Sequence, residues 1–200
     1  MRKYFIKTKA GYTIIETMIS ISLFIVVVMV GMESLLNANV VHQKSQDMSS
    51  IIDNMNFIME DMSRNIRTGY NYHCITIGED IYTSNLSSPK SGASCWGIAF
   101  ESARGDTSDP NDQWVYVINA SHNVLKSEVG ASGASSFMQL NPDLEVVMDA
   151  VSGFSVLGAE APSDTQQPFA NIRLVGKITY KSVITSFALQ SSVSQRLVDR

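Results

Sequence analysis

Two cysteines are the first side chains in this sequence whose type and position suggest chemistry. Cys74 and Cys95 are the only cysteines of the chain, and both follow an apolar N-terminal segment. They would therefore lie on the exported side of a membrane, where an oxidising compartment lets thiols pair. A disulfide between them would be structural and worth about 3 kcal/mol in the chain-entropy model. Two unlinked thiols are the alternative if the host does not oxidise its exported proteins.

Three aspartates form the second candidate. Asp106, Asp109 and Asp112 are spaced by three residues in GDTSDPND, a stretch rich in the oxygen ligands that calcium prefers. The spacing departs from that of an EF-hand loop. We favour a solvated turn, because Asp106 and Asp109 can cap turns through their own backbone. The prediction is therefore no metal, with a calcium site as the weaker alternative.

No catalytic motif is visible elsewhere in the sequence. His42, His73 and His122 are scattered over a predicted helix, strand and turn, without H-E-x-x-H, G-x-S-x-G or a phosphate-binding glycine pattern. GASGASS (130–136) comes closest to a glycine-rich loop, and we interpret it as a flexible loop. The sequence therefore predicts a protein that is not an enzyme and has no cofactor.

Size and charge narrow the class further. Two hundred residues allow one domain with a core, or one long helix with a modest globular part. The net charge of -4 is spread along the chain except at its basic N-terminus, so we predict no nucleic-acid-binding face. The basic residues that precede the first acid are Arg2, Lys3, Lys7 and Lys9.

An apolar segment follows this basic leader. From Thr17 to Met32 the chain has no charge and no proline, and extension back to Tyr12 adds only Glu16. The segment approaches the roughly 20 residues of a membrane-spanning helix. A basic leader predicts a cytoplasmic N-terminus and export of everything after Met32. We therefore predict a single-pass inner-membrane protein with an exported body.

Three interpretations of the apolar segment compete. A secretory signal peptide needs a small-residue cleavage site after the apolar run, and GMESLLNANVVHQ has no clean match. An uncleaved signal anchor explains the charge asymmetry. It does not explain an acid near the start of the run, where an ionised carboxylate costs up to roughly 3 kcal/mol. The third interpretation comes from a resemblance.

The stretch KAGYTIIETMISISLFIVVV closely resembles the type IV prepilin signature. A basic leader ends in Gly11, an aromatic residue follows, and Glu16 is the fifth residue after the glycine. The resemblance implies cleavage by a prepilin peptidase between Gly11 and Tyr12, N-methylation of Tyr12, and retention of the apolar helix. It also implies that Glu16 pairs with the N-terminal amine of a neighbouring subunit, which would relieve the cost of the buried charge. The alternative is that Glu16 lies near the headgroups and stays solvated.

Beyond the membrane segment the chain stays compatible with a helix to Thr68, where Gly69 supplies a stop. The helix from Tyr12 to Thr68 would be about 85 Å long. Apolar or small residues recur at alternating spacings of four and three, which predicts an amphipathic helix. They are Val41, Ser45, Met48, Ile52, Met55, Met59, Met62 and Ile66. We favour packing of the four methionines against the globular domain over an adaptable partner-binding surface.

After Gly69 the period changes to that of β-strands. Short β-prone runs between turn-rich stretches lie at 73–77, 95–101, 113–119, 123–128, 144–149, 154–158, 171–180 and 183–192. The runs 113–119 and 123–128 predict a hairpin. The aromatic residues predicted to fill the core are Trp96, Trp114, Tyr116 and Phe154. A helix followed by antiparallel strands predicts an α+β fold, with the long helix packed on an antiparallel sheet.

The predicted organisation has three parts. Residues 1–11 form a cleaved leader, residues 12–68 a long helix that spans the membrane over 12–32, and residues 69–200 a β-rich globular domain. Four segments of the body are similar to minor pilins of the W type and pseudopilins of the J type. They are IRTGYNY, WVYVI with NVLK, VSGFSVL and SFALQSSVSQR.

This resemblance implies a pilin-like fold and a place in a filament. The chain would help to initiate or cap a type IV pilus or a type II secretion pseudopilus at the inner membrane. Its partners would be other pilin or pseudopilin subunits, the prepilin peptidase and the membrane. The alternative hypothesis is a signal-anchored, exported β domain that binds a ligand or surface without entering a filament.

Overall fold

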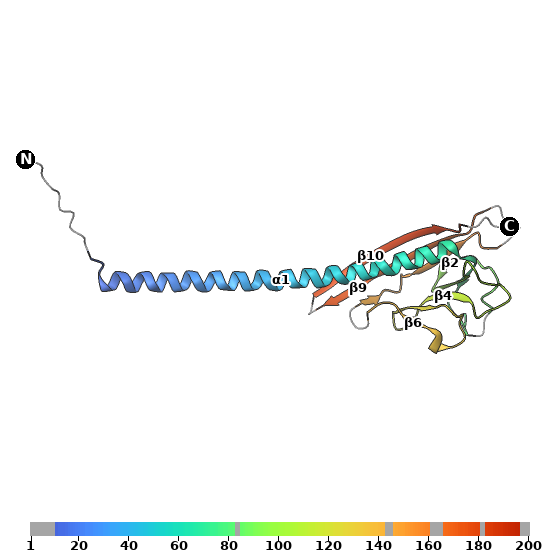
Figure 1. The fold of residues 1–200 in the computed structure, drawn as a ribbon, viewed down its shortest axis with the longest axis horizontal. Coiled ribbons are helices and arrows are strands. Elements are labelled where there is room, and N and C mark those ends of the chain that lie inside the picture. Colours follow the sequence, from blue (N-terminus) through green and yellow to red (C-terminus); the bar gives the residue numbers. More distant parts are fainter. Residues whose placement is uncertain (1–10, 83–84, 143–145, 161–165, 181–182, 197–200) are drawn as a thin grey trace, which may run out of the picture. The chain divides into compact units, whose positions relative to one another are not determined.

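The computed structural model describes residues 11–82, 85–142, 146–160, 166–180 and 183–196 (Figure 1). Its elements are α1 (Ile14–Thr68), β1 (Tyr70–Ile75), β2 (Gly92–Cys95), β3 (Gly97–Glu101), β4 (Gln113–Ile118), β5 (Val124–Ser127), the 3-10 helix η1 (Ala134–Ser136), β6 (Met138–Gln139), β7 (Val146–Met148), β8 (Gly153–Leu157), β9 (Phe169–Tyr180) and β10 (Val183–Ser194). A long N-terminal helix packs on antiparallel sheets, so the predicted α+β fold is confirmed.

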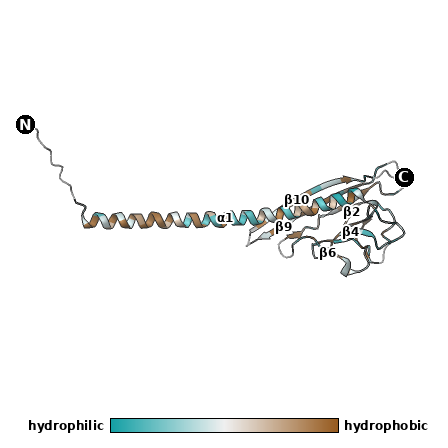
Figure 2. Cartoon of the chain, viewed as in Figure 1, coloured by the Kyte–Doolittle hydropathy of each residue, from teal (hydrophilic) through white to brown (hydrophobic). Residues whose placement is uncertain are grey.

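The chain forms two compact units that divide inside α1, after Gln46. In the first unit the apolar side chains of α1 are exposed, and most of the helix near its start is coloured hydrophobic in Figure 2. Within α1, Glu16 is the only charged residue before Glu33. A helix that is apolar on every side suits a lipid environment. By length and composition α1 can cross a membrane, as predicted.

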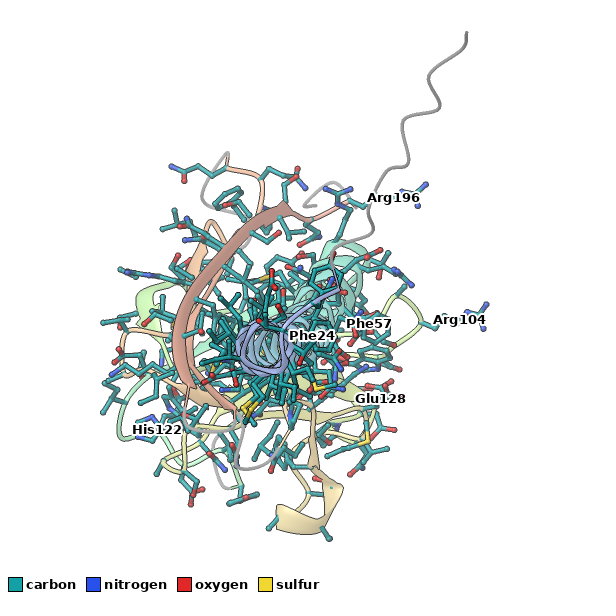
Figure 3. All side chains as sticks on the ribbon, turned by 90° about the vertical axis from the view of Figure 1, so that its left-hand side faces the viewer. Phe24, Phe57, Arg104, His122, Glu128 and Arg196 are labelled. Atoms are coloured by element: carbon teal, nitrogen blue, oxygen red, sulfur yellow. A yellow bond between two sulfur atoms is a disulfide. The ribbon has the colours of Figure 1, made fainter. Side chains whose placement is uncertain are left out.

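In the second unit, from Asp47 onward, one face of α1 packs on the sheets. Its buried residues are Ile51, Met55, Ile58, Met59, Met62 and Ile66. Three of the four stripe methionines therefore lie in the core, which supports the packing interpretation. Val41 and Ser45 of the predicted stripe are exposed, whereas Ile51 and Ile58 widen the buried face beyond it. Phe57 lies on another face of the helix and is 65% exposed (Figure 3).

α1 ends at Thr68, as predicted, but for a different reason. The amide of Gly69 donates to the carbonyl of Asn65 at 2.9 Å and so closes the last turn. A Cβ at Gly69 would lie 2.3 Å from Cδ2 of Phe100, so the position requires glycine because β3 approaches closely. Two residues further on, Asn71 has a left-handed backbone, with φ of 57°, at the irregularity in β1.

The described strands form two antiparallel sheets. The first has the order β1-β3-β4-β5-β6, and the second has the order β10-β9-β8-β2, with β7 also paired to β9. The predicted hairpin is confirmed as β4 and β5, which pair from Val115↔Ser127 to Ile118↔Val124. Of the aromatic side chains predicted for the core, Tyr116 and Phe154 are buried, whereas Trp96 and Trp114 are partly buried.

The predicted single strand over residues 95–101 is wrong, because the chain changes sheets within it. β2 ends at Cys95 and pairs with β8, whereas β3 begins at Gly97 and pairs with β1 and β4. Trp96 lies at the crossing: its amide donates to the carbonyl of Ile75 at 3.0 Å, and its indole N–H donates to the carbonyl of Thr76 at 2.8 Å. These two hydrogen bonds fix the point where the chain passes from the second sheet to the first, next to the end of β1.

Candidate functional site

The N-terminal candidate site lies where α1 begins. Gly11 and Tyr12 precede the helix, which starts at Ile14, and residues 1–10 lie outside the described part of the chain. The hydroxyl of Thr13 accepts a hydrogen bond from the amide of Glu16 at 3.3 Å. This T-x-x-E spacing is that of a capping box. The helix therefore starts just beyond the predicted cleavage site, and Thr13 caps it.

Glu16 is the acid of this site and lies in the first turn of α1. Its side chain is exposed, and no described cation lies within ion-pair distance of it. The positive end of the helix dipole stabilises a carboxylate in the first turn. Deeper in a membrane the same group needs a cationic partner to offset its desolvation. The site thus offers an acid at the head of an apolar helix, without a cationic partner among the residues from Gly11 onward that the structure describes.

The predicted disulfide between Cys74 and Cys95 is confirmed. The two Cα atoms lie 5.4 Å apart, and both side chains are buried. Cys74 belongs to β1 in the first sheet and Cys95 to β2 in the second, so the bond joins the two sheets covalently. A Cβ at Gly92 would lie 2.3 Å from the sulfur of Cys74, so glycine leaves the space that the bond needs.

The three aspartates of GDTSDPND do not converge on one point. Asp106 accepts a hydrogen bond from the amide of Ser108 at 3.0 Å, and Asp109 accepts one from the amide of Asn111 at 3.0 Å. Both carboxylates therefore cap turns of their own loop. Among the residues that the structure describes, no group of three acids, histidines or cysteines is placed to hold a metal ion.

Asp112 instead faces Glu101, a residue that the sequence did not single out. Glu101 ends β3 and is 0% exposed, and the side-chain amide of Gln113 donates to its Oε1 at 2.7 Å. Oε2 of Glu101 and Oδ1 of Asp112 are both buried, and no described donor reaches either atom. Burial raises the pKa of Glu101 to about 7. The hydrogen bond from Gln113 lowers this pKa, whereas the nearby charge of Asp112 raises it further. A proton on Glu101 would satisfy both oxygens.

A second polar cluster surrounds His73, which is 3% exposed. Its Nδ1 lies 2.6 Å from the carbonyl of Ser88, and its Nε2 lies 2.9 Å from a carboxylate oxygen of Glu79. Both neighbours are hydrogen-bond acceptors, so each ring nitrogen contacts one acceptor. Burial favours a higher pKa for Glu79, but hydrogen bonds from Lys90, the amide of Thr76 and His73 outweigh it and hold the pKa at about 2.

Glu79→Gln is expected to lower the free energy of unfolding by about 2 kcal/mol near pH 7. The folded-state pKa lies below the ordinary value, so the stabilisation is full above about pH 4.5 and disappears as the pH falls to about 2. Urea unfolding of the full chain in detergent at neutral and acid pH measures the difference. Glu60→Gln, which removes an exposed pair with Arg64, is the control and should cost less than about 0.5 kcal/mol. An equal loss for Glu79→Gln at both pH values would contradict this account.

A third cluster fastens α1 to the β4–β5 hairpin. The ammonium group of Lys126 lies 3.1 Å from Asp61 of α1 and 2.8 Å from Glu128. It also lies 4.5 Å from the ring centroid of Trp114, a cation–π distance. Trp114 borders a cavity of about 230 Å³ beside the end of α1. This volume is below the roughly 300 to 1,000 Å³ of ordinary ligand pockets.

Comparison of the chain with protein-family models, with curated proteins and with solved structures gives no match.

Proposed function

We propose that this chain is a minor pilin or pseudopilin subunit that helps to initiate or cap a type IV pilus or a type II secretion pseudopilus. One observation carries the proposal: α1 starts three residues after Gly11, and its apolar segment to Met32 carries a single acid, Glu16, in the first turn. A membrane-compatible helix and a disulfide-bonded domain also support it. The proposal assigns the chain no catalysis.

The proposed mechanism follows from the cost of Glu16 in a membrane. The basic leader keeps the N-terminus in the cytoplasm. Cleavage after Gly11 frees the amine of Tyr12, and α1 stays in the membrane. An ionised Glu16 costs up to roughly 3 kcal/mol in lipid, and the amine of a neighbouring subunit relieves that cost only at the correct axial offset. Assembly and register are thereby coupled.

The alternative function is an exported, membrane-anchored β domain that binds a ligand or surface by itself. The cavity between Phe100, Arg104 and Trp114 is the observation in its favour. Its volume is large enough for a single side chain or a very small molecule but too small for a drug-sized ligand. In this alternative the leader and Glu16 serve only export.

Processing is tested by intact-mass and N-terminal peptide mass spectrometry of the chain from native membranes. We expect a mature chain that begins at Tyr12 and carries one methyl group. A chain that still begins at Met1, in cells whose other prepilins are processed, would refute the proposal and leave the alternative.

Assembly is tested with Glu16→Gln and Glu16→Ala. Glutamine keeps the capping box but removes the charge, whereas alanine removes both. We expect both variants to be exported, folded and oxidised, and neither to sediment with filaments. Glu33→Gln, which changes the next acid along α1, should assemble normally. Normal assembly of Glu16→Gln would show that Glu16 acts only as a helix cap.

A further inference from the structure

β10 forms one edge of the second sheet. It pairs with β9 over its whole length, Val183↔Tyr180 to Ser194↔Phe169, without a shift in register. On its other side the structure places no strand among the described residues. Arg196, which is labelled in Figure 3, lies two residues beyond the end of β10. The sheet therefore exposes a long row of backbone groups.

One hydrogen bond shows which residues of β10 point their backbone groups toward β9 and which point them outward. Just past the end of β10, the amide of Gln195 donates to the carbonyl of Pro168 at 2.9 Å. In an antiparallel pair, alternate residues point both backbone groups toward the partner strand. Because the register has no shift, the even-numbered residues of β10 point their N–H and C=O groups outward. They are Ile184, Ser186, Ala188, Gln190, Ser192 and Ser194.

Edge strands normally carry devices that block further pairing: charges, proline, bulges or short length. β10 is twelve residues long and has no charged residue and no proline. Three other described edges are protected. β6 has two residues, β2 has four with an irregular register, and β1 is covered by backbone hydrogen bonds between Lys90 and both Tyr72 and Cys74. The long, uncharged edge of β10 differs from these three edges.

We propose that the edge of β10 accepts an extended segment of a second exported polypeptide, which joins the sheet as a further strand. Only an extended backbone can satisfy alternating outward N–H and C=O groups. The inference goes beyond the proposed function and does not depend on entry into a filament.

The side chains of β10 define the chemistry of the segment. Phe187 and Leu189 pack on the core but stay only partly buried, so the incoming strand needs apolar side chains on that face. Ser186, Ala188 and Gln190 are exposed on the other face and match small or polar neighbours. The absence of charge along β10 favours an uncharged segment of alternating apolar and polar residues.

A second copy of this chain fits the edge less well. The hydroxyl of Ser63 donates to that of Ser191 at 2.9 Å, and the amide of Arg196 donates to the carbonyl of Arg67 at 2.9 Å. β10 therefore runs in the same direction as the adjacent part of α1. Antiparallel pairing of two β10 strands would oppose the α1 helices of the two copies. Two chains anchored in one membrane through that helix run in the same direction, which opposes antiparallel pairing of two copies, and parallel pairing is slightly less stable per residue. We therefore favour a tail or loop of another protein.

The test uses a photo-crosslinking side chain at Gln190 of the full chain in native membranes. We expect crosslinks to an uncharged, extended peptide of one protein, mapped by mass spectrometry. Ala188→Pro removes an outward N–H that β9 does not use, and proline is tolerated at such edge positions. This variant should keep its disulfide and its melting temperature but lose crosslinking about tenfold, the effect of one or two lost hydrogen bonds.

A crosslinker at Leu157 is the matched control, because this exposed residue lies on β8, an interior strand of the same sheet. It should not capture the same peptide. Crosslinks at Gln190 that persist in Ala188→Pro would place the partner on the sheet face and overturn the proposal. Crosslinks to a second copy of this chain, or none at all, would overturn it too.

Discussion

Glu101→Gln is expected to raise the free energy of unfolding by about 3 kcal/mol near pH 8 and to change it little near pH 4. At acid pH the wild-type carboxyl is protonated and neutral, as glutamine is. Near pH 8 it is ionised, fully buried and next to Asp112. The new amide can donate to Oδ1 of Asp112, which has no donor among the described residues.

The expected gain in unfolding free energy at high pH follows from the direction of the pKa shift of Glu101. The pKa of Glu101 rises from 4.5 to about 7 on folding, so the folded state holds the proton more tightly. Wild-type stability therefore falls between about pH 4.5 and about pH 7 and then levels off. Each pKa unit corresponds to roughly 1.4 kcal/mol, which gives the expected magnitude.

Urea unfolding of the full chain in detergent at the two pH values measures this effect. Asp109→Asn is the matched control, because this exposed aspartate lies in the same loop but faces its own turn. A stability gain for Glu101→Gln that is equal at both pH values would show that the gain does not come from ionisation.

Removal of the disulfide by the double substitution Cys74→Ala and Cys95→Ala should cost about 3 kcal/mol in unfolding free energy. The bond restricts the unfolded chain, and both sulfurs lie in the core. Alanine is preferable to serine here, because serine would bury two hydroxyl groups without partners. Denaturant unfolding of the full chain in detergent measures the loss.

Reduction of the wild-type protein is the internal control for this experiment. It should lower stability by a similar amount, and it should leave the double variant unchanged. The denaturant dependence should also steepen in the variant, because an unlinked chain exposes more surface when it unfolds. If the reductant destabilises the double variant equally, the loss does not come from this bond.

The sequence predicted those parts of the fold whose signals are local. α1 was expected over residues 12–68 and spans Ile14–Thr68, because an uninterrupted helical period and the lack of proline are visible along the chain. The β4–β5 hairpin was predicted for the same kind of reason. The break at Trp96 was missed, because hydrogen bonds to the end of β1 decide where the chain changes sheets.

The polar clusters were harder to predict, since their partners are distant in sequence. Asp61 lies outside the predicted apolar stripe of the helix, yet it accepts hydrogen bonds from Tyr116 and Lys126 of the hairpin. Glu101 ends a β-prone run, and nothing local indicates that it is fully buried. At the N-terminal site the motif remains a prediction, because the proposed partner of Glu16 belongs to another subunit.

The bond between Cys74 and Cys95 also has a mechanical consequence. A pull on the ends of this domain would break backbone hydrogen bonds one row after another. The two cysteines are 21 positions apart, and the disulfide prevents the segment between them from extending. The stretched chain is therefore about 70 Å shorter than it would be without the bond. The two sheets also stay tethered after their contacts fail. A stretched domain therefore keeps its halves close together and can close again when the load is released.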